Sequence, residues 1–162
     1  MPTILFVHEK LDVYQLELEF ISWLTDLFDE LREKKTARLA EVLDQLGRAS
    51  LSQLLNTAEG NGKRIGQLRA RFFDDARGST TECATCLDAL VAKRACLPKR
   101  IEQGKAMLVR IVSMLTKLVD RFDDTSGAER AQESRTSSSR RTRTRTRTRT
   151  RTRTKMGGYE HG

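Results

Sequence analysis

The sequence lacks any apolar run long enough to cross a bilayer, and it lacks a convincing export signal. A spanning helix needs about 20 mainly apolar residues. The apolar start Ile4-Leu5-Phe6-Val7 is far shorter and has no basic residue before it, which is unlike a signal peptide. We therefore expect a cytoplasmic protein that has no membrane segment.

Cysteine and histidine are scarce. The three cysteines are Cys83, Cys86 and Cys96, and an odd number without an export signal predicts reduced thiols. Cys83 and Cys86 form a C-x-x-C, but redox use needs a helix N-terminus and this pair falls in mid-helix. Zinc needs four ligands, and His8 and His161 lie near the two ends of the chain. We interpret the thiols as small buried side chains, without a metal or cofactor.

Catalytic motifs are missing as well. The sequence contains no recognisable nucleophile–base arrangement. The segment Gly60-Asn61-Gly62-Lys63 lacks the spacing of a P-loop and follows a predicted helix, not a strand. The acidic pairs Asp74-Asp75 and Asp123-Asp124 would point apart on a helix. The sequence therefore predicts no catalytic residues and a protein that is not an enzyme.

Apolar residues become rare towards the C-terminus. Residues 130–162 hold only Ala131, Met156 and Tyr159 as apolar side chains, too few for a core. Residues 1–124 carry 19 Lys/Arg and 19 Asp/Glu, whereas residues 125–162 carry 11 and 3, so the tail supplies the whole net charge of +8. We expect a folded domain over 1–124 and a disordered Arg/Thr-rich tail over 125–162.

Four segments of the first 124 residues have helical periodicity, with apolar residues at steps of three and four. We expect helices at about 12–35, 36–59, 64–94 and 98–122, with Asp12 capping the first and Pro98 in the first turn of the last. Residues 60–62 should end the second helix in the left-handed conformation. This pattern predicts an all-α four-helix bundle.

Each expected helix has its own expected core positions. They are Val13, Leu16, Phe20, Leu24, Leu27 and Leu31; Leu39, Val42, Leu43, Leu46, Ala49, Leu51, Leu54, Leu55 and Ala58; Phe72, Ala76, Ser79, Cys83, Cys86 and Leu90; and Ile101, Gly104, Leu108, Ile111, Leu115, Leu118 and Phe122. The last set alternates steps of three and four throughout, which favours side-by-side helix packing.

Linked motifs in the middle of the chain resemble a known family. They are Asp44-Gln45-Leu46-Gly47-Arg48-Ala49-Ser50-Leu51-Ser52, Asn56-Thr57-Ala58-Glu59-Gly60-Asn61-Gly62-Lys63, Arg71-Phe72-Phe73, Ala76-Arg77-Gly78-Ser79 and Glu82-Cys83, preceded by His8-Glu9-Lys10-Leu11-Asp12-Val13-Tyr14-Gln15. Over about residues 8–122 the chain resembles the proteins encoded in intervening sequences of bacterial 23S rRNA genes. That family is similar to Avd, the accessory protein of diversity-generating retroelements.

The resemblance implies an antiparallel up-down-up-down bundle that assembles into a homo-oligomeric ring, commonly a pentamer. It implies no catalytic activity. For the Avd branch it implies binding of nucleic acid and of a reverse transcriptase. Two departures stand in this chain: Gln53-Leu54 replace the Ile-Pro that the family often has, and the first 124 residues are neutral where the Avd branch is strongly basic.

The Arg-Thr repeat over residues 141–154 is the strongest candidate for nucleic-acid binding. In an extended chain, residues i and i+2 lie on one face about 6.6–6.8 Å apart, close to twice the axial phosphate spacing of about 3.4 Å per strand. RNA or single-stranded DNA could thus be bound without sequence preference; the alternative is a repeat expansion with no specific role. The candidate side chains are Arg140, Arg141, Arg143, Arg145, Arg147, Arg149, Arg151, Arg153 and Lys155.

The bundle offers a weaker candidate surface and several structural positions. Basic residues near the start of the third helix could touch RNA, although such residues are usually a solvated face: Lys63, Arg64, Arg69, Arg71 and Arg77. Several polar residues and glycines are interpreted as structural: Ser50, Asn56, Glu59, Gly60 and Gly78. Arg77 is a natural ion-pair partner for Glu59. Gly78 lies in mid-helix, where glycine is unfavourable, so we expect a packing reason for it. The sequence thus favours a non-catalytic, ring-forming bundle that binds nucleic acid or acts as a scaffold; the alternative is a purely structural interaction module with an incidental tail.

Overall fold

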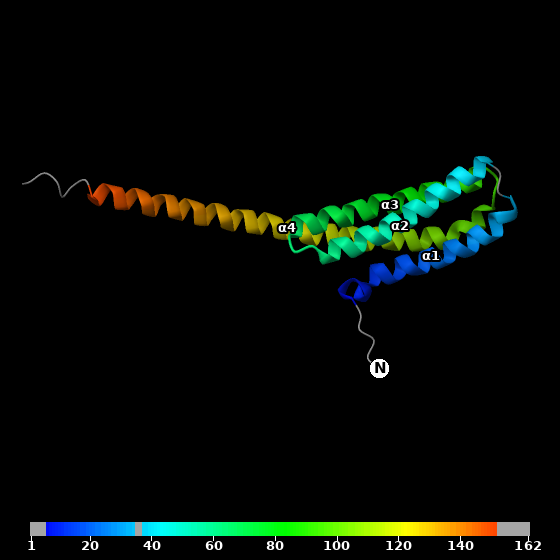
Figure 1. Cartoon of the computed structure of the whole chain (residues 1–162), viewed down its shortest axis with the longest axis horizontal. Coiled ribbons are helices and arrows are strands. Elements are labelled where there is room, and N and C mark those ends of the chain that lie inside the picture. Colours follow the sequence, from blue (N-terminus) through cyan, green and yellow to red (C-terminus); the bar gives the residue numbers. More distant parts are fainter. Residues whose placement is uncertain (1–5, 35–36, 152–162) are drawn as a thin grey trace, which may run out of the picture. The chain divides into compact units, whose positions relative to one another are not determined.

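The computed structural model describes the backbone of residues 6–34 and 37–151, and the side chains of residues 6–34 and 38–124. The described residues form helices and contain no strand, which confirms the all-α prediction (Figure 1). The elements are the short 3-10 helices η1 (Val7–Lys10) and η2 (Arg32–Lys34) and the helices α1 (Asp12–Leu31), α2 (Ala37–Gly62), α3 (Gly66–Ala92) and α4 (Pro98–Arg151).

Helix α1 is antiparallel to both of its neighbours. Glu17, near the start of α1, accepts a hydrogen bond from the hydroxyl of Thr57, near the end of α2, at 2.7 Å. Glu30, near the end of α1, pairs with Arg100 in the first turn of α4 at 2.7 Å. The start of α1 therefore lies beside the end of α2, and the end of α1 lies beside the start of α4.

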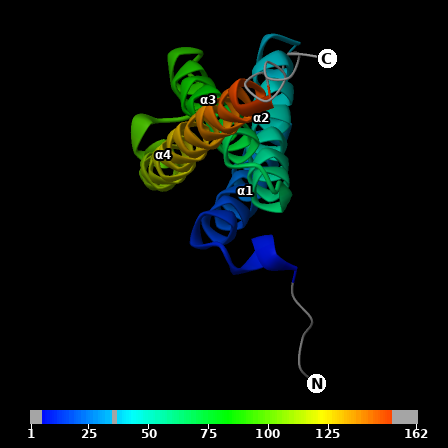
Figure 2. The same ribbon diagram turned by 90° about the vertical axis from the view of Figure 1, so that its left-hand side faces the viewer.

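Helix α3 is likewise antiparallel to its two neighbours. Gly60, near the end of α2, lies against Phe72 in the second turn of α3. Asp88, late in α3, pairs with Lys105 early in α4 at 2.6 Å. The helices thus run up, down, up and down around a shared interior, and the colours follow this alternation in Figure 1. Figure 2 shows the same four helices from the side at right angles to that view.

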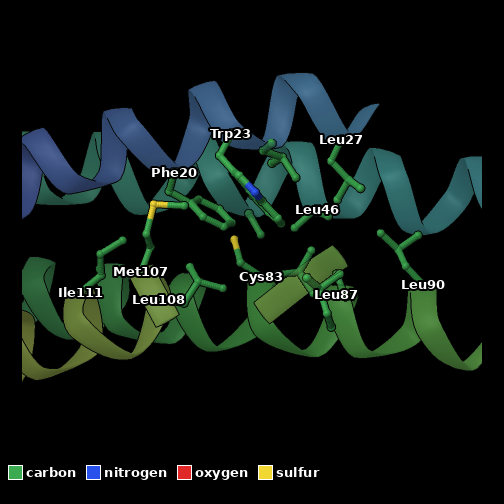
Figure 3. Packing of buried hydrophobic residues seen from close by; sticks show 14 of the residues in the cluster. Phe20, Trp23, Leu27, Leu46, Cys83, Leu87, Leu90, Met107, Leu108 and Ile111 are labelled. Carbon is green, nitrogen blue, oxygen red and sulfur yellow. The ribbon is translucent and has the colours of Figure 1, made fainter. Parts of the chain in front are cut away.

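The interior of the bundle is filled by apolar side chains from all four helices (Figure 3). Phe20 and Phe73 are fully buried. The other fully buried apolar side chains include Leu27, Leu46, Leu87, Leu90, Leu108, Ile111 and Leu115. At about 1.5–3 kcal/mol for each large apolar side chain, this core is the main stabilising term.

The predicted stripes of α1 and α4 are confirmed. All six core positions predicted for the first helix are buried, and so are the first five of the last helix. Leu118 and Phe122 are partly buried and pack against the core. The first turn of α1 differs from the prediction, since Leu11 and not Asp12 is the N-cap residue, without a side-chain hydrogen bond.

The prediction for the second half of α2 is wrong. Leu51 and Leu55 are 52% and 55% exposed, whereas Gln53 and Thr57 are fully buried. The core stripe begun by Leu46 continues through positions 53, 57 and 60, which keep the three- and four-residue steps but are not apolar. The predicted stripe of Leu51, Leu54, Leu55 and Ala58 also has steps of three and four, so spacing alone did not separate it from the stripe that is buried.

Four of the six core positions predicted for α3 are buried, namely Ala76, Cys83, Cys86 and Leu90, and the other two are not. Phe73 and Thr80 are fully buried, whereas Phe72 and Ser79 are only partly buried. The helix begins at Gly66 rather than at Arg64. Small apolar and polar residues dominate this face, so hydrophobicity alone defined it poorly.

The helix ends also differ from the predictions. Helix α2 continues through Gly62, and neither Gly60 nor Gly62 has a left-handed φ. The left-handed residue is instead Arg94, at φ 59°. It follows α3 in a Schellman turn, where Ala95 N–H donates to the Leu90 carbonyl and Arg94 N–H donates to the Val91 carbonyl, both at 2.9 Å.

The chain divides into two compact units, residues 1–123 and 124–162, and only the first contains the bundle. Helix α4 was expected to end at Phe122, but its backbone remains helical to Arg151. The prediction took the last apolar step as the end of the helix, but apolar periodicity marks where packing ends and not where the helical backbone ends. The predicted disordered tail otherwise falls on residues outside the described part, namely the side chains from 125 on and the whole of 152–162.

Candidate nucleic-acid interface

The side chains of the predicted tail interface lie outside the described residues. The backbone of Arg140 to Arg151 belongs to α4, and Arg153 and Lys155 are outside the described backbone as well. The tail interface thus stays a prediction from the sequence. The bundle positions, in contrast, can be followed residue by residue.

Two of the predicted basic residues are engaged by aromatic rings at one end of the bundle. The Lys63 ammonium lies 4.6 Å from the ring centroid of Phe72. The Arg69 guanidinium lies 4.2 Å from the ring centroid of Phe122 and donates to the Asn61 side-chain oxygen at 3.1 Å. These contacts are typical of cation–π packing, so both cations stabilise the junction of α2, α3 and α4.

A third basic residue is neutralised within its own helix. Arg77 pairs with Asp74 one turn earlier at 2.6 Å. The predicted partner Glu59 is therefore wrong, because the intrahelical carboxylate lies within reach at the favoured i, i+3 spacing. Arg64 and Arg71 are exposed and have no ion pair among the described residues.

A hollow of about 480 Å³ lies between α3 and the bundle part of α4. Its charged lining is mixed, since Arg71 and Arg77 face it together with Asp74 and Asp123. A phosphate backbone is attracted by a net positive field, which this lining does not provide. The lining of this hollow therefore lacks the net positive charge that RNA contact by the basic residues of the bundle would need.

The positions interpreted as structural have different roles. The Ser50 hydroxyl donates to the Gly47 carbonyl at 2.8 Å, and the Asn56 amide donates to the Ser52 hydroxyl at 3.2 Å. Both side chains thus bond within α2. Ser52 in turn shares a hydrogen bond of 2.9 Å with Ser79 of α3, so this small network joins the two helices.

The two structural glycines differ from each other. A Cβ at Gly60 would lie 3.0 Å from the Phe72 Cβ and 3.1 Å from the Phe73 ring, so only glycine fits there without a shift. A Cβ at Gly78 would meet nothing within 4 Å. The packing reason expected for Gly78 is therefore absent, because this residue lies on the exposed side of α3.

Sequence reasoning missed a buried carboxyl group. Glu17 is fully buried in α1 and bonds to Thr57 through Oε1, whereas Oε2 has no hydrogen-bond partner among the described residues. Burial raises the pKa of Glu17 to about 8, against a smaller lowering by the Thr57 bond. At neutral pH this carboxyl is mainly protonated and neutral, as desolvation dictates.

Gln53 is a second buried polar residue, one turn before Thr57 in α2. Its side chain is fully buried, and neither amide atom has a hydrogen-bond partner among the described residues.

The burial of Glu17 could have been predicted from the sequence. Glu17 stands four residues after Val13 and three before Phe20, within the apolar stripe of α1. A polar residue at a core step was thus detectable, but its partner was not.

The two cysteines of the C-x-x-C are buried as predicted, whereas Cys96 is only partly buried. Cys83 and Cys86 are free and buried, and burial raises the pKa of Cys83 to about 12. A thiol of that pKa is protonated at neutral pH and is a poor nucleophile or metal ligand. Among the described residues, no cluster of three or more His, Cys, Asp or Glu could hold a metal ion. The helices of the same residues contain no apolar stretch of the length that a bilayer requires.

The comparisons with known proteins bear on the bundle and not on the tail. Residues 9–117 match the model of a family described as 23S rRNA-intervening sequence protein. The match begins just before α1 and ends within the bundle part of α4. No curated protein matches the chain.

Proposed function

Since this chain belongs to the 23S rRNA-intervening sequence protein family, we propose that it is a non-catalytic, ring-forming helical bundle that binds nucleic acid. In this proposal the bundle provides assembly, and the basic C-terminal segment provides the contact with RNA or single-stranded DNA. The protein then acts as a nucleic-acid-bound scaffold or accessory protein.

The observation that carries this proposal is the separation of charge along the chain. Residues 1–124 are neutral, and residues 125–162 hold the whole net charge of +8. A segment of 11 basic and 3 acidic residues releases counterions when it neutralises phosphates, and this drives sequence-independent binding. With one aromatic residue, Tyr159, in this segment, base stacking adds little.

The contacts within the bundle support assigning binding to the tail. Lys63, Arg69 and Arg77 are occupied by rings or by a carboxylate, which leaves Arg64 and Arg71 as the exposed cations of the predicted strip. Two separated cations contribute few of the phosphate contacts that stable binding needs. Assembly of several chains would bring several tails together and raise the overall affinity through avidity.

A second candidate function is a purely structural interaction module whose tail is incidental. The exposed leucines of α2, Leu51 and Leu55, favour it, because apolar side chains grouped on an outer helix face are typical of contacts with other proteins. This candidate predicts oligomers that do not bind RNA.

Binding of RNA and of single-stranded DNA should be compared for the full chain and for a shortened chain that ends at Asp124. We expect binding by the full chain at physiological salt and its loss on shortening. Equal binding by both chains would place the contact on the bundle surface. No binding by either chain would refute the proposed function and favour the interaction module.

A further inference from the structure

The outer face of α2 carries an apolar strip between two charges. Leu51 and Leu55 are about half exposed, and they line a shallow hollow of about 400 Å³ with Arg48, Ser52, Asn56 and Glu59. Positions 48, 51, 55 and 59 follow one another at steps of three, four and four, so they share one side of the helix. We call these four residues the α2 strip.

Neither charge of the α2 strip is neutralised within the described chain. The Arg48 guanidinium donates to the uncharged Gln45 side chain at 2.7 Å. Glu59 is exposed and has no ion pair among the described residues, since Arg77 is taken by Asp74. A positive and a negative group thus stand at opposite ends of an exposed pair of leucines.

This pattern is complementary to itself when it is reversed. Arg48 and Glu59 are eleven residues apart, or about 16 Å along the helix at a rise of about 1.5 Å per residue. Their midpoint lies between Gln53 and Leu54, beneath the leucines. Turning a second strip by 180° about that point exchanges its two charges. Leu51 of the turned strip then lies about 1.5 Å along the helix axis from the level of Leu55 of the first, which is the rise of one residue.

We propose that the α2 strip binds the α2 strip of a second copy of this chain, with the two helices antiparallel. Arg48 of each copy then meets Glu59 of the other, twice by symmetry, around a centre made by the four leucines. The contact is isologous, using one patch against itself. It goes beyond the proposed function, because a ring closes through two different faces, whereas this contact joins chains or rings in pairs.

The leucines are tested by substitution in the full chain. Leu51→Asp and Leu55→Asp should halve the number of chains in the assembly, measured by native mass spectrometry and light scattering, because each places a charge in the apolar centre. Val109→Asp is the matched control, since Val109 is 68% exposed on α4 and should leave the mass unchanged. Circular dichroism checks that every variant keeps its helices.

The charges give a sharper test of the antiparallel pairing. Arg48→Glu alone, or Glu59→Arg alone, sets like charges opposite each other twice and should weaken pairing by about 10-fold or more. The double variant Arg48→Glu/Glu59→Arg exchanges the charges and should restore the native affinity within about 3-fold.

Two results would overturn the proposal. An unchanged mass in both leucine variants would show that the strip is not a contact. A double charge variant as weak as the single ones would show that the strip meets a different surface, whether of a ring neighbour or of another protein. RNA binding enters neither measurement, so failure of the proposed function leaves this test intact.

Discussion

The indole of Trp23 lies directly against the backbone of Gly104, where α1 crosses α4. A Cβ at position 104 would overlap the Cζ3 and Cη2 atoms of the ring and would lie 2.9 Å from Cζ2. The Arg100 guanidinium lies 5.2 Å from the centre of the same ring, one turn earlier in α4. Glycine at position 104 therefore sets how closely these two helices approach.

Gly104→Ala should destabilise the bundle, because the added methyl group has to displace the indole ring or separate α1 from α4. Overpacking of this kind costs about 1–3 kcal/mol, and the better helix propensity of alanine offsets about 1 kcal/mol at most. We expect a net loss of about 1–2 kcal/mol in the free energy of unfolding, measured by urea denaturation.

Gly78→Ala is the matched control for that substitution. The methyl group would meet no atom within 4 Å on the exposed side of α3, so only helix propensity changes. We expect a gain of about 0.5–1 kcal/mol. If both variants shifted stability in the same direction, the close approach of Trp23 to Gly104 would not be the controlling contact.

Glu17 should make the stability of the bundle depend on pH. Its pKa is about 8 in the fold and has an ordinary value of 4.5, so the folded chain binds an extra proton between those values. The free energy of unfolding should therefore be highest at low pH within this window. It should fall steadily as the pH rises from about 4.5 towards 8, and level off above.

Glu17→Gln isolates this effect, because it removes the ionisable group at nearly constant shape. Urea unfolding from pH 5 to 9 should show the variant gaining on the native chain as the pH rises, with the largest difference above pH 8. Parallel stability curves for the two proteins across this range would show that Glu17 ionises normally in the fold.

Arg94→Gly should stabilise the end of α3. Arg94 has a left-handed φ of 59° within a Schellman turn, a conformation that costs a residue with a Cβ about 1 kcal/mol and that glycine adopts freely. After the larger entropy of glycine in the unfolded chain is subtracted, we expect a gain of about 0.5 kcal/mol in thermal or urea unfolding. A loss of stability would indicate that the Arg94 side chain makes a compensating contact.

The sequence predicted α1 and the bundle part of α4 well, because their core steps are occupied almost entirely by large apolar residues. It failed in the second half of α2, where the core steps hold Gln53 and Thr57 while Leu51 and Leu55 lie outside. Two stripes with helical spacing compete there, one lined by leucines and one by polar residues. Spacing alone does not decide between them, because both keep the steps of one helix face.

Ion pairs were less predictable than helices. Arg77 was expected to pair with Glu59 across helices, but Asp74 in its own helix takes it at 2.6 Å. The cross-helix pairs that do form, such as Glu30 with Arg100, depend on how two helices are aligned along their length. The packing of Trp23 on Gly104 is another contact between the same two helices, and no local pattern in the sequence reveals it.

The salt dependence of RNA binding tests the central claim most directly. The full chain should be compared with a variant of the same length in which the seven arginines of the Arg-Thr repeat, residues 141–153, are replaced by glutamine. For single strands the slope of log K against log salt is about −0.7 per phosphate contact. We therefore predict that the variant loses about five units of slope along with most of its affinity. Equal slopes for the two proteins would contradict the account and place the nucleic-acid contact elsewhere on the chain.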